Sequence, residues 1–357
     1  MPVRPLARFV RATPQVRAFA LATLLPLPLL ALGAVFGGWF AWGALALITL
    51  VTFALDELTA RAAPDAPEGV EFPAANRLSA ALGVAHFAAL ALAVWALSGA
   101  AGLSAASWVA VFLGFGLFFG QVSNANAHEL IHRTERSLFW LGMWVYISLG
   151  FGHHTSAHRL VHHRFAATDD DPNSAALGEG FWDFAPRAWA GSFRAGYEME
   201  EGLRARAAGR ARINPYPIYI AGTLAVALAV SIAFGVFGLF AWVALAAYAQ
   251  LQLLLSDYVQ HYGLRRRIDA EGRAEPIGPG HSWDAPHPAS SLWMLNAPRH
   301  SDHHAHPARP YPALRFGQRT PTRPVLPRSL PAMATLALVP PLWRKVMDRR
   351  VRALQQP

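Results

Sequence analysis

The chain has 357 residues, of which 54% are hydrophobic and only 15% are charged. Soluble domains carry about 25% charged residues, so this composition excludes an ordinary soluble protein and predicts a membrane protein. Because cysteine is absent, disulfides, zinc–thiolate sites and iron–sulfur clusters are excluded, and any electrons must come from another protein. The net charge of +9 is almost wholly arginine, with Lys345 the single lysine, and no basic–aromatic pattern predicts binding to nucleic acid.

Three long blocks without a formal charge, residues 18–55, 78–127 and 213–256, predict the membrane-spanning part. A span needs about 20 residues, so each block is expected to form two helices that turn near a glycine: Gly37–Gly38, Gly99 and Gly235. We therefore predict an all-α integral membrane protein, a single domain over residues 1–357, with six transmembrane helices in three hairpins. The predicted spans are residues 18–36, 39–55, 78–97, 106–124, 217–234 and 236–256.

The arginines avoid the three predicted turns. They lie in the N-terminal segment (Arg4, Arg8, Arg11 and Arg17), the loop 56–77, residues 128–212 and the C-terminal tail. Because positively charged segments tend to stay on the cytoplasmic side, both termini are predicted to be cytoplasmic. Residues 158–212 and 257–357 are then expected to form a helical cytoplasmic cap.

Residues 137–157 form a further charge-free run, with arginines before and after it. If this run crossed the membrane, the histidines on its two sides would lie in different compartments. We predict instead that it lies in the membrane interface or dips into it, where Trp140, Trp144 and Tyr146 are favourable.

Nine of the fifteen histidines occur in groups, most of them at helical spacing. Residues four apart share a helix face, so His128 and His132 should point the same way, as should His158 and His162. Imidazole is a common ligand of zinc, iron, copper and nickel, and one metal takes about four to six ligands, so nine imidazoles predict two metals. The predicted ligands are His128, His132, His158, His162, His163, His261, His300, His303 and His304.

Nine neutral ligands leave the charge of the metals uncompensated. Nearby groups are therefore expected to balance this charge and to orient the imidazole rings. The candidates are Glu129, Asp171, Asp257, Asp302 and His153. The run that ends at Asp171 is equally compatible with a solvated loop or a helix cap. His86, alone in the third predicted span, is expected to be a hydrogen-bonded residue of the helix bundle.

Two other classes of metal protein explain the grouped histidines less well. The residues from His128 to His132 match the His-Glu-x-x-His motif of zinc proteases, in which the glutamate is a general base. A catalytic zinc needs only about three protein ligands, so most of the grouped histidines would stay unexplained. A metal transporter would place its ligands midway through the spans, whereas these histidines lie at span ends and in cytoplasmic segments.

Four elements carry a family resemblance. They are His-Glu-Leu-Ile-His-Arg at 128–133, His-Arg-Leu-Val-His-His at 158–163, Gln-His-Tyr-Gly-Leu at 260–264 and Arg-His-Ser-Asp-His-His-Ala at 299–305. Together they resemble the integral-membrane alkane monooxygenases, a branch of the histidine-box di-iron hydroxylases and desaturases. The resemblance implies two irons on the nine histidines, dioxygen as co-substrate and terminal hydroxylation of an alkane. It also implies a multi-pass protein of the bacterial inner membrane that receives electrons from rubredoxin and rubredoxin reductase.

The chain departs from the family pattern at three places. Ala157 and Gln260 replace glutamates that are common in the family, and Ala297-Pro298 replaces Leu-Gln. The predicted metal ligands are unchanged, so the sequence still predicts the same metal chemistry. Two carboxylates near these ligands are missing, so the sequence constrains the substrate less than it constrains the reaction. A methyl-aromatic hydroxylase and a fatty-acyl desaturase therefore stay open as alternatives.

Two surfaces are expected to contact partners. The substrate should enter from the bilayer between helices, where Trp42, Phe115 and Phe119 are candidates for limiting its chain length. The arginines at 265–267 and in the C-terminal tail are expected to contact either an acidic electron donor or anionic lipid.

Overall fold

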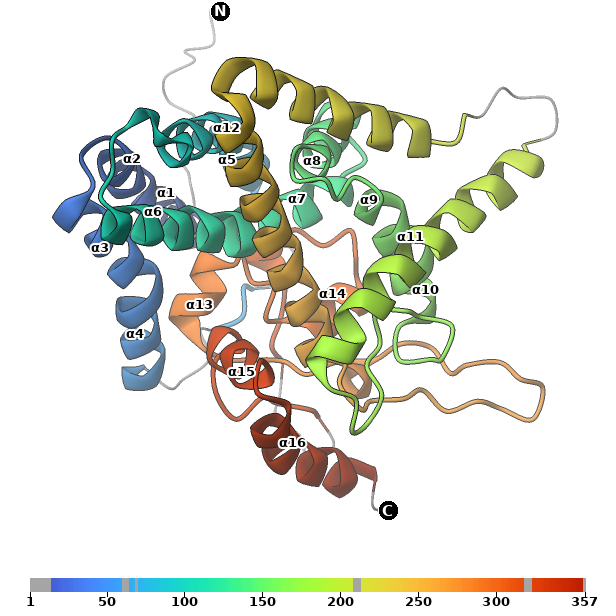
Figure 1. The fold of residues 1–357 in the computed structure, drawn as a ribbon. Helices are drawn as coiled ribbons and strands as arrows, with labels where there is room; N and C mark the ends of the chain where they lie inside the picture. The colour runs from blue at the N-terminus through green and yellow to red at the C-terminus, as the bar shows by residue number, and fades with distance from the viewer. Residues whose placement is uncertain (1–13, 60–63, 68–69, 208–212, 318–322, 356–357) are drawn as a thin grey trace, which may run out of the picture.

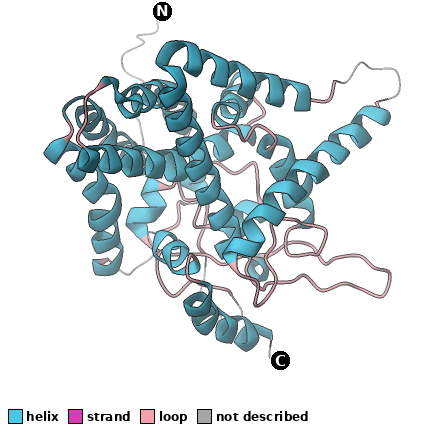
Figure 2. Ribbon diagram, in the orientation of Figure 1, coloured by secondary structure: helices cyan, strands magenta, loops and turns pink. Residues whose placement is uncertain are grey.

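The computed structural model describes residues 14–59, 64–67, 70–207, 213–317 and 323–355. These residues form helices joined by loops and turns, with two isolated β-bridges (Figures 1 and 2). The helical fold class is thus confirmed for the described part of the chain. The predicted cytoplasmic segment with Arg4, Arg8 and Arg11 lies outside the described residues, as do residues 208–212 and 318–322 of the predicted cap.

The first half of the chain supplies the helices before the second histidine group. These helices are α1 (Pro14–Leu24), α2 (Pro26–Phe36), α3 (Gly38–Ala46), α4 (Thr52–Leu58), α5 (Pro73–Trp95), α6 (Ala105–Phe118), α7 (Asn124–Ile131) and α8 (Arg136–Ser148). Three π-helical turns interrupt or extend them: η2 (Leu47–Val51), η3 (Ala96–Ala100) and η4 (Phe119–Ser123).

The second half carries the remaining histidine groups. Its helices are α9 (His154–Ala157), α10 (His163–Phe165), α11 (Phe181–Ala205), α12 (Tyr216–His261), α13 (Pro288–Trp293), α14 (His300–Ala305), α15 (Leu330–Ala337) and α16 (Pro340–Gln355). The short turns are η5 (His158–His162, π-helical), η6 (Pro279–His281) and η7 (Tyr311–Ala313).

In the described part of the chain, five helical segments are long and apolar enough to span a membrane: Val16–Phe36, Gly38–Leu58, Pro73–Ala100, Ala105–Ile131 and Tyr216–His261. The last has 46 residues and would be about 69 Å long if straight, more than twice the hydrocarbon core of about 30 Å. It is broken at Gly235, where φ is 66° and ψ is −166°, a conformation that glycine adopts without steric cost. The helices also break at Gly37 and Gly99.

The second half of α12 packs closely on the fourth of these segments. A side chain on Gly116 would begin 2.3 Å from Tyr248 Cδ1, and one on Gly120 would begin 2.2 Å from the Gln252 amide. Glycines four apart let two helix backbones approach, as in other membrane helix pairs. The contact is extended by Asn124, which donates from Nδ2 to the Ala249 carbonyl at 2.8 Å. It holds the C-terminal end of α12 beside α7, so that His261 can meet the other histidines.

The run 137–157 does not form a long helix. Helix α8 has 13 residues, against the about 20 that a span needs, and the chain turns at Gly150, where φ is 67°. Helix α8 packs against α7, because a side chain on Gly142 would begin 2.7 Å from Leu130 Cβ. The turn returns the chain into α9 and η5, which carry the second histidine group toward the first.

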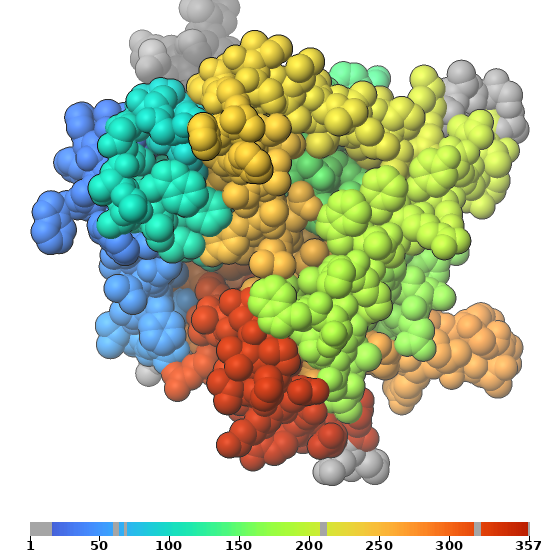
Figure 3. All heavy atoms as spheres, in the orientation of Figure 1, coloured from blue at the N-terminus to red at the C-terminus, as the bar shows by residue number. Residues whose placement is uncertain are grey.

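Large apolar side chains are exposed on α3, α4 and both halves of α12. Trp39 is 93% exposed, Leu58 is 81% exposed and Phe237 is 71% exposed. An apolar surface of this extent indicates contact with membrane rather than water. Helices α15 and α16 lie against the start of α11, at another part of the molecule (Figure 3). In this contact Trp182 Nε1 donates to the Leu338 carbonyl at 3.0 Å.

Candidate metal centre

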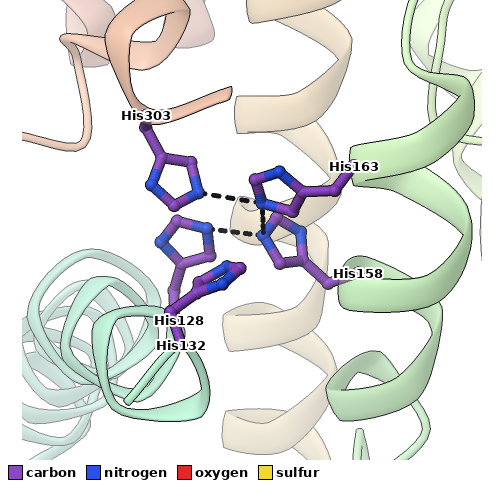
Figure 4. Close-up of side chains that lie close together, drawn as sticks. All are labelled: His128, His132, His158, His163 and His303. Carbon is purple, nitrogen blue, oxygen red and sulfur yellow. Dashed lines mark hydrogen bonds between the residues drawn. The ribbon is translucent and has the colours of Figure 1, made fainter. Parts of the chain in front are cut away.

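The structure brings all nine predicted histidines together in two clusters. One cluster contains His128, His132, His158, His163 and His303; the other contains His162, His261, His300 and His304. Within each cluster the available ring nitrogens all lie within 4.8 Å of one another. Figure 4 shows how the five rings of the first cluster converge from three separate parts of the chain.

The second histidine group is divided between the clusters by its helix geometry. In an α-helix His158 and His162 would share a face, but residues 158–162 form a π-helical turn, in which residues five apart are in register. His158 therefore joins His163 in the five-histidine cluster, while His162 points to the other one. The prediction that His158 and His162 point the same way is wrong for this reason.

The third group follows ordinary α-helical spacing. On α14, His300 and His304 share a face and enter the four-histidine cluster, whereas His303 enters the five-histidine cluster. On α7, His128 and the C-cap residue His132 point into the same cluster, as predicted. One six-residue helix thus contributes to both clusters and fixes how they are placed relative to each other.

The nitrogen–nitrogen distances suit a shared ion. In the five-histidine cluster, Nε2 of His158 lies 2.7 Å from Nε2 of His128 and 2.9 Å from Nε2 of His163. In the other cluster, Nε2 of His300 lies 3.0 Å from Nε2 of both His261 and His304. Two imidazole nitrogens bound to one ion at about 2.0–2.1 Å, at right angles, stand about 2.9 Å apart.

Unsatisfied nitrogens support the same interpretation. Nε2 of His132 and Nε2 of His162 are buried, and neither has a hydrogen-bond partner among the described residues. A buried polar atom without a partner costs free energy, which a bound cation would recover. The residues present therefore fit one metal ion in each cluster.

Electrostatics keeps most of the rings neutral, which is the form that binds metal. Burial lowers the pKa of His158, His163, His303 and His304 well below the usual value, and neighbouring imidazoles lower it further. His162 is the exception, since burial alone would lower its pKa but the Asp171 carboxylate raises it.

Asp171 lies directly behind His162. Its Oδ2 accepts a hydrogen bond from His162 Nδ1 at 2.9 Å and another from the Ser174 hydroxyl at 2.7 Å. The backbone N–H of Asn173 donates to Asp171 Oδ1 at 3.1 Å, and the Asn173 amide donates to Asp257 Oδ2 at 2.6 Å. Asn173 was not among the predicted residues, although it lies only two residues after Asp171, which was.

Three other predicted residues make different contacts. Glu129 accepts hydrogen bonds from Arg133 and from the backbone N–H of Tyr311, and Asp302 accepts from Arg309 at 2.5 Å. These carboxylates brace the segment after α14 rather than contacting a clustered ring nitrogen. His153 packs against Trp189 on α11, with ring centroids 5.0 Å apart, and lies 3.5 Å from the Ser192 hydroxyl.

The departures from the family pattern have structural counterparts. A side chain on Gly196 of α11 would begin 3.1 Å from Ala157 Cβ, so α11 occupies the space next to this position. Gln260 donates to the Ala297 carbonyl at 3.1 Å and accepts from the Ser256 hydroxyl at 3.0 Å, which ties the end of α12 to the loop before His300. The amide positions this loop without adding charge.

Asp284 was missed by the sequence reasoning. It is fully buried, accepts the backbone N–H of Ser301 at 2.9 Å and pairs with Arg323 at 2.7 Å. These contacts hold the first turn of α14, which carries three of the clustered histidines. Nothing in the sequence marks Asp284, because its partners lie 17 and 39 residues away.

A small cavity of about 50 Å³ adjoins both clusters and is lined by His128, His158, His300 and Asp257, among others. It shares four lining residues with a larger groove of about 440 Å³ between η2–α4, the second half of α12 and α15: Gly120, Gln121, Ser256 and Met294. The groove is mostly apolar, with side chains such as Phe53, Leu251 and Leu338. Trp42, Phe115 and Phe119 line neither space.

His86 is satisfied within the bundle. Its Nδ1 lies 2.9 Å from the Ser123 hydroxyl and its Nε2 lies 2.9 Å from the Ser148 hydroxyl. Both ring nitrogens therefore have partners, and this histidine lies outside the two clusters.

Comparison with known proteins places these features in a family. The family model for fatty acid desaturases matches residues 103–337. The chain is 35% identical to alkane 1-monooxygenase of Pseudomonas putida, over 74% of this chain and 65% of that protein. It is 30% identical to alkane 1-monooxygenase 2 of Alcanivorax borkumensis, over 88% of this chain and 84% of that protein.

A third relative, alkane 1-monooxygenase of Acinetobacter baylyi, is 34% identical over 63% of this chain and 55% of that protein. The chain thus spans just under two thirds of the Pseudomonas putida protein and more than four fifths of the Alcanivorax borkumensis protein. The chain belongs to the fatty acid desaturase family, and within it to the group of the alkane 1-monooxygenases.

Proposed function

We propose that this protein hydroxylates the terminal methyl group of an apolar hydrocarbon, an n-alkane in the first place, to a primary alcohol. The reaction consumes one dioxygen, two electrons and two protons, and releases one water. The observation that carries the proposal is the pair of histidine clusters beside a cavity that shares lining residues with a mostly apolar groove. The names of the relatives support the same substrate class.

The nine clustered histidines would hold two irons, five imidazoles around one and four around the other. When bound, this di-iron centre supplies the activation of dioxygen and the oxidation of the methyl group. Asp171 fixes the orientation of His162, and Asp284 fixes α14, so the ligands are in place before metal arrives. The Asp257 carboxylate lines the cavity and accepts a hydrogen bond from the Asn173 amide. It would therefore lie beside the substrate methyl group in this cavity.

The groove would admit the hydrocarbon from the bilayer. Its walls are mostly apolar, although Thr52 and Asp56 of α4 also line it, and Gln121 and Met294 line both the groove and the cavity. Gln121 is held by Trp293, whose indole N–H donates to Oε1 of the Gln121 side-chain amide at 2.7 Å. An alkyl chain that reaches from the groove into the cavity would therefore present its terminal methyl to the clustered histidines.

The proposal includes the membrane arrangement. Counting α12 as two spans because of the break at Gly235 gives six spans, with the termini and the cap of residues 158–212 and 257–357 on the cytoplasmic side of the bacterial inner membrane. The electrons would come from rubredoxin and rubredoxin reductase, since the chain has no cysteine to hold a redox centre of rubredoxin type.

A fatty-acyl desaturase is the second candidate, because the matching family model carries that name. The two candidates share the metal site but give different products, an alcohol or an alkene. The zinc-protease alternative loses support from the geometry: Glu129, its required base, is engaged by Arg133 and by the Tyr311 backbone.

The test is metal analysis of the purified protein, followed by reaction with octane, a rubredoxin system and labelled ¹⁸O₂. We expect about two irons per chain, as nine imidazole ligands require, and 1-octanol that carries one label. A single zinc per chain, or an alkene formed from an acyl substrate without any alcohol from octane, would overturn the proposal.

A further inference from the structure

The C-terminal helix α16 has two contrasting faces. Its apolar side chains Trp343, Met347 and Val351 are completely buried against the protein. The opposite face exposes Arg344, Lys345, Arg349 and Arg352. Asp348 is the one acidic residue in this helix, and its carboxylate accepts a hydrogen bond from the Tyr262 hydroxyl at 2.6 Å.

Among the described residues, Arg352 is the one cation of this face that is paired with a carboxylate, and that pair is long. Arg344 donates to the Gly178 carbonyl at 3.4 Å and Arg349 to the Lys345 carbonyl at 3.2 Å. Arg352 lies 3.9 Å from Asp348, a distant pair on a side chain that is 63% exposed. The exposed face therefore keeps a strong positive potential, which would attract and orient an acidic protein.

Beneath this face, aromatic side chains form a packed path to the four-histidine cluster. The Trp343 ring lies 5.2 Å from the Tyr262 ring and 5.4 Å from the Tyr258 ring, measured between centroids. Tyr262 follows His261 directly in the chain, and Nε2 of His261 is 3.0 Å from Nε2 of His300. The buried side of α16 is thus in continuous contact with a residue that neighbours a clustered histidine.

We propose that the exposed face of α16 is the docking surface for an acidic one-electron carrier protein, whose electrons reach the four-histidine cluster through Trp343 and Tyr262. This inference rests on the proposed function, which needs two electrons per hydroxylation. Each encounter oxidises the carrier by one electron and reduces the metal centre by one, so two encounters serve one turnover.

Anionic lipid is the competing occupant of a basic helix, but the faces of α16 do not suit it. A helix that lies in a membrane surface turns an apolar face toward the lipid. In α16 the apolar side chains are buried against the rest of the protein, so they cannot contact lipid. The exposed face, from Arg344 to Arg352, carries cationic side chains instead. Leu342, at the first turn of the helix, is the exposed large apolar side chain of α16.

The first experiment measures binding of oxidised rubredoxin, as the probe, to the protein in nanodiscs of zwitterionic lipid. The test variant is Lys345→Glu/Arg349→Glu/Arg352→Glu. The matched control is Arg194→Glu/Arg204→Glu/Arg206→Glu, which makes the same charge change at exposed positions in the second half of α11 and at its C-cap. We expect binding to weaken at least tenfold in the α16 variant and less than twofold in the control, with both differences shrinking at high salt.

The second experiment separates docking from transfer. Oxidation of reduced rubredoxin is followed by stopped flow with the iron-loaded protein. We expect Trp343→Phe to lower the limiting rate without changing the rubredoxin concentration at half saturation, whereas the α16 charge variant changes that concentration. Equal loss in the charge variant and its control, or wild-type binding in the charge variant, would overturn the inference.

The inference and the proposed function can fail separately. Protein reduced chemically by dithionite, then exposed to dioxygen and octane, reports hydroxylation without any carrier protein. If octanol forms there but the α16 variant binds rubredoxin normally, only the docking inference is wrong. If the wild-type protein is incorporated preferentially into nanodiscs that contain anionic lipid and the α16 variant is not, α16 is a lipid-binding surface.

Discussion

The two histidine clusters use the same ligand type, yet the protein holds them differently. All four histidines of the smaller cluster are buried, whereas His128, His132 and His163 of the larger one are partly exposed. In the smaller cluster His162 is anchored by Asp171 and His261 by the His281 carbonyl at 3.2 Å. In the larger cluster the buried Nδ1 atoms of His158 and His163 have no partner among the described residues.

Contacts behind a ligand fix its orientation and raise its affinity for metal. We therefore expect a division of roles, in which the four-histidine cluster would be the more rigid metal site and the five-histidine cluster the more adaptable one. The Nδ1 atom of His304 also has no partner among the described residues, so the rigidity of the smaller cluster depends on His162 and His261.

Removal of His300 should have the largest effect. The change His300→Ala leaves three imidazoles in the rigid cluster and deletes the nitrogen that lies 3.0 Å from both His261 and His304. We expect the metal content to fall by one ion per chain and hydroxylation to fall more than about 100-fold, beyond the range for loss of an outer partner. His306→Ala is the control, since this ring is 52% exposed and lies outside both clusters. Full metal content in His300→Ala would contradict the assignment.

Asp171→Asn tests the anchor rather than a ligand. The amide keeps the size of the side chain but removes the charge that faces His162 Nδ1. Metal affinity and activity should fall about 10–100-fold, as for other partners of metal-bound histidines. Asp170→Asn, at an exposed position next to it, should change neither. Competition with a chelator measures the affinity, and equal affinities in the two variants would show that Asp171 does not support the site.

The effect of His132→Ala should be milder than that of His300→Ala or Asp171→Asn, because four imidazoles remain in the five-histidine cluster. We expect about a tenfold loss of affinity at this site, at the low end of the range for weakened metal sites. Chelator should remove metal from the wild-type protein in two phases, and only the fast phase should accelerate in the variant. Acceleration of the slow phase would mean that the two clusters are not independent.

The sequence alone predicted the nine histidines, because their spacing and number are local features. It could not predict how they divide between two clusters. The π-helical turn at His158–His162 moves His162 away from His158, and a pattern based on α-helical spacing places them on the same face. The break of α12 at Gly235 was indicated by the length of its apolar block, whereas the orientation of its two halves depends on packing.

Contacts between distant segments were the harder part. Asp284 and Asn173 contact the site through partners that are distant in the sequence, Ser301 for Asp284 and Asp257 for Asn173. Conversely, Glu129 and Asp302 lie next to clustered histidines in sequence, but their carboxylates face Arg133 and Arg309. Proximity in the chain therefore did not predict which carboxylate contacts a ring nitrogen.

The same limitation applies to the groove, where a substitution is expected to affect only the longest substrates. Phe115 and Phe119 are completely buried in the bundle and Trp42 is 46% exposed, so none of them bounds the groove. Ala334 on α15 does line it, and Ala334→Trp would fill part of the space that a long alkyl chain needs. Such overpacking costs about 1–3 kcal/mol, so turnover of the longest accepted alkane should fall about tenfold, which corresponds to about 1.4 kcal/mol.

Shorter alkanes should react at the wild-type rate in Ala334→Trp, because their chains end before the blocked segment. Trp42→Ala is the matched control on α3 and should leave the whole profile of alkane lengths unchanged. Competition among alkanes from hexane to hexadecane, with the alcohols separated by gas chromatography, gives the profile in one experiment. If Trp42→Ala shifts the profile and Ala334→Trp does not, the hydrocarbon reaches the clusters by a route along α3, and α15 does not border the substrate.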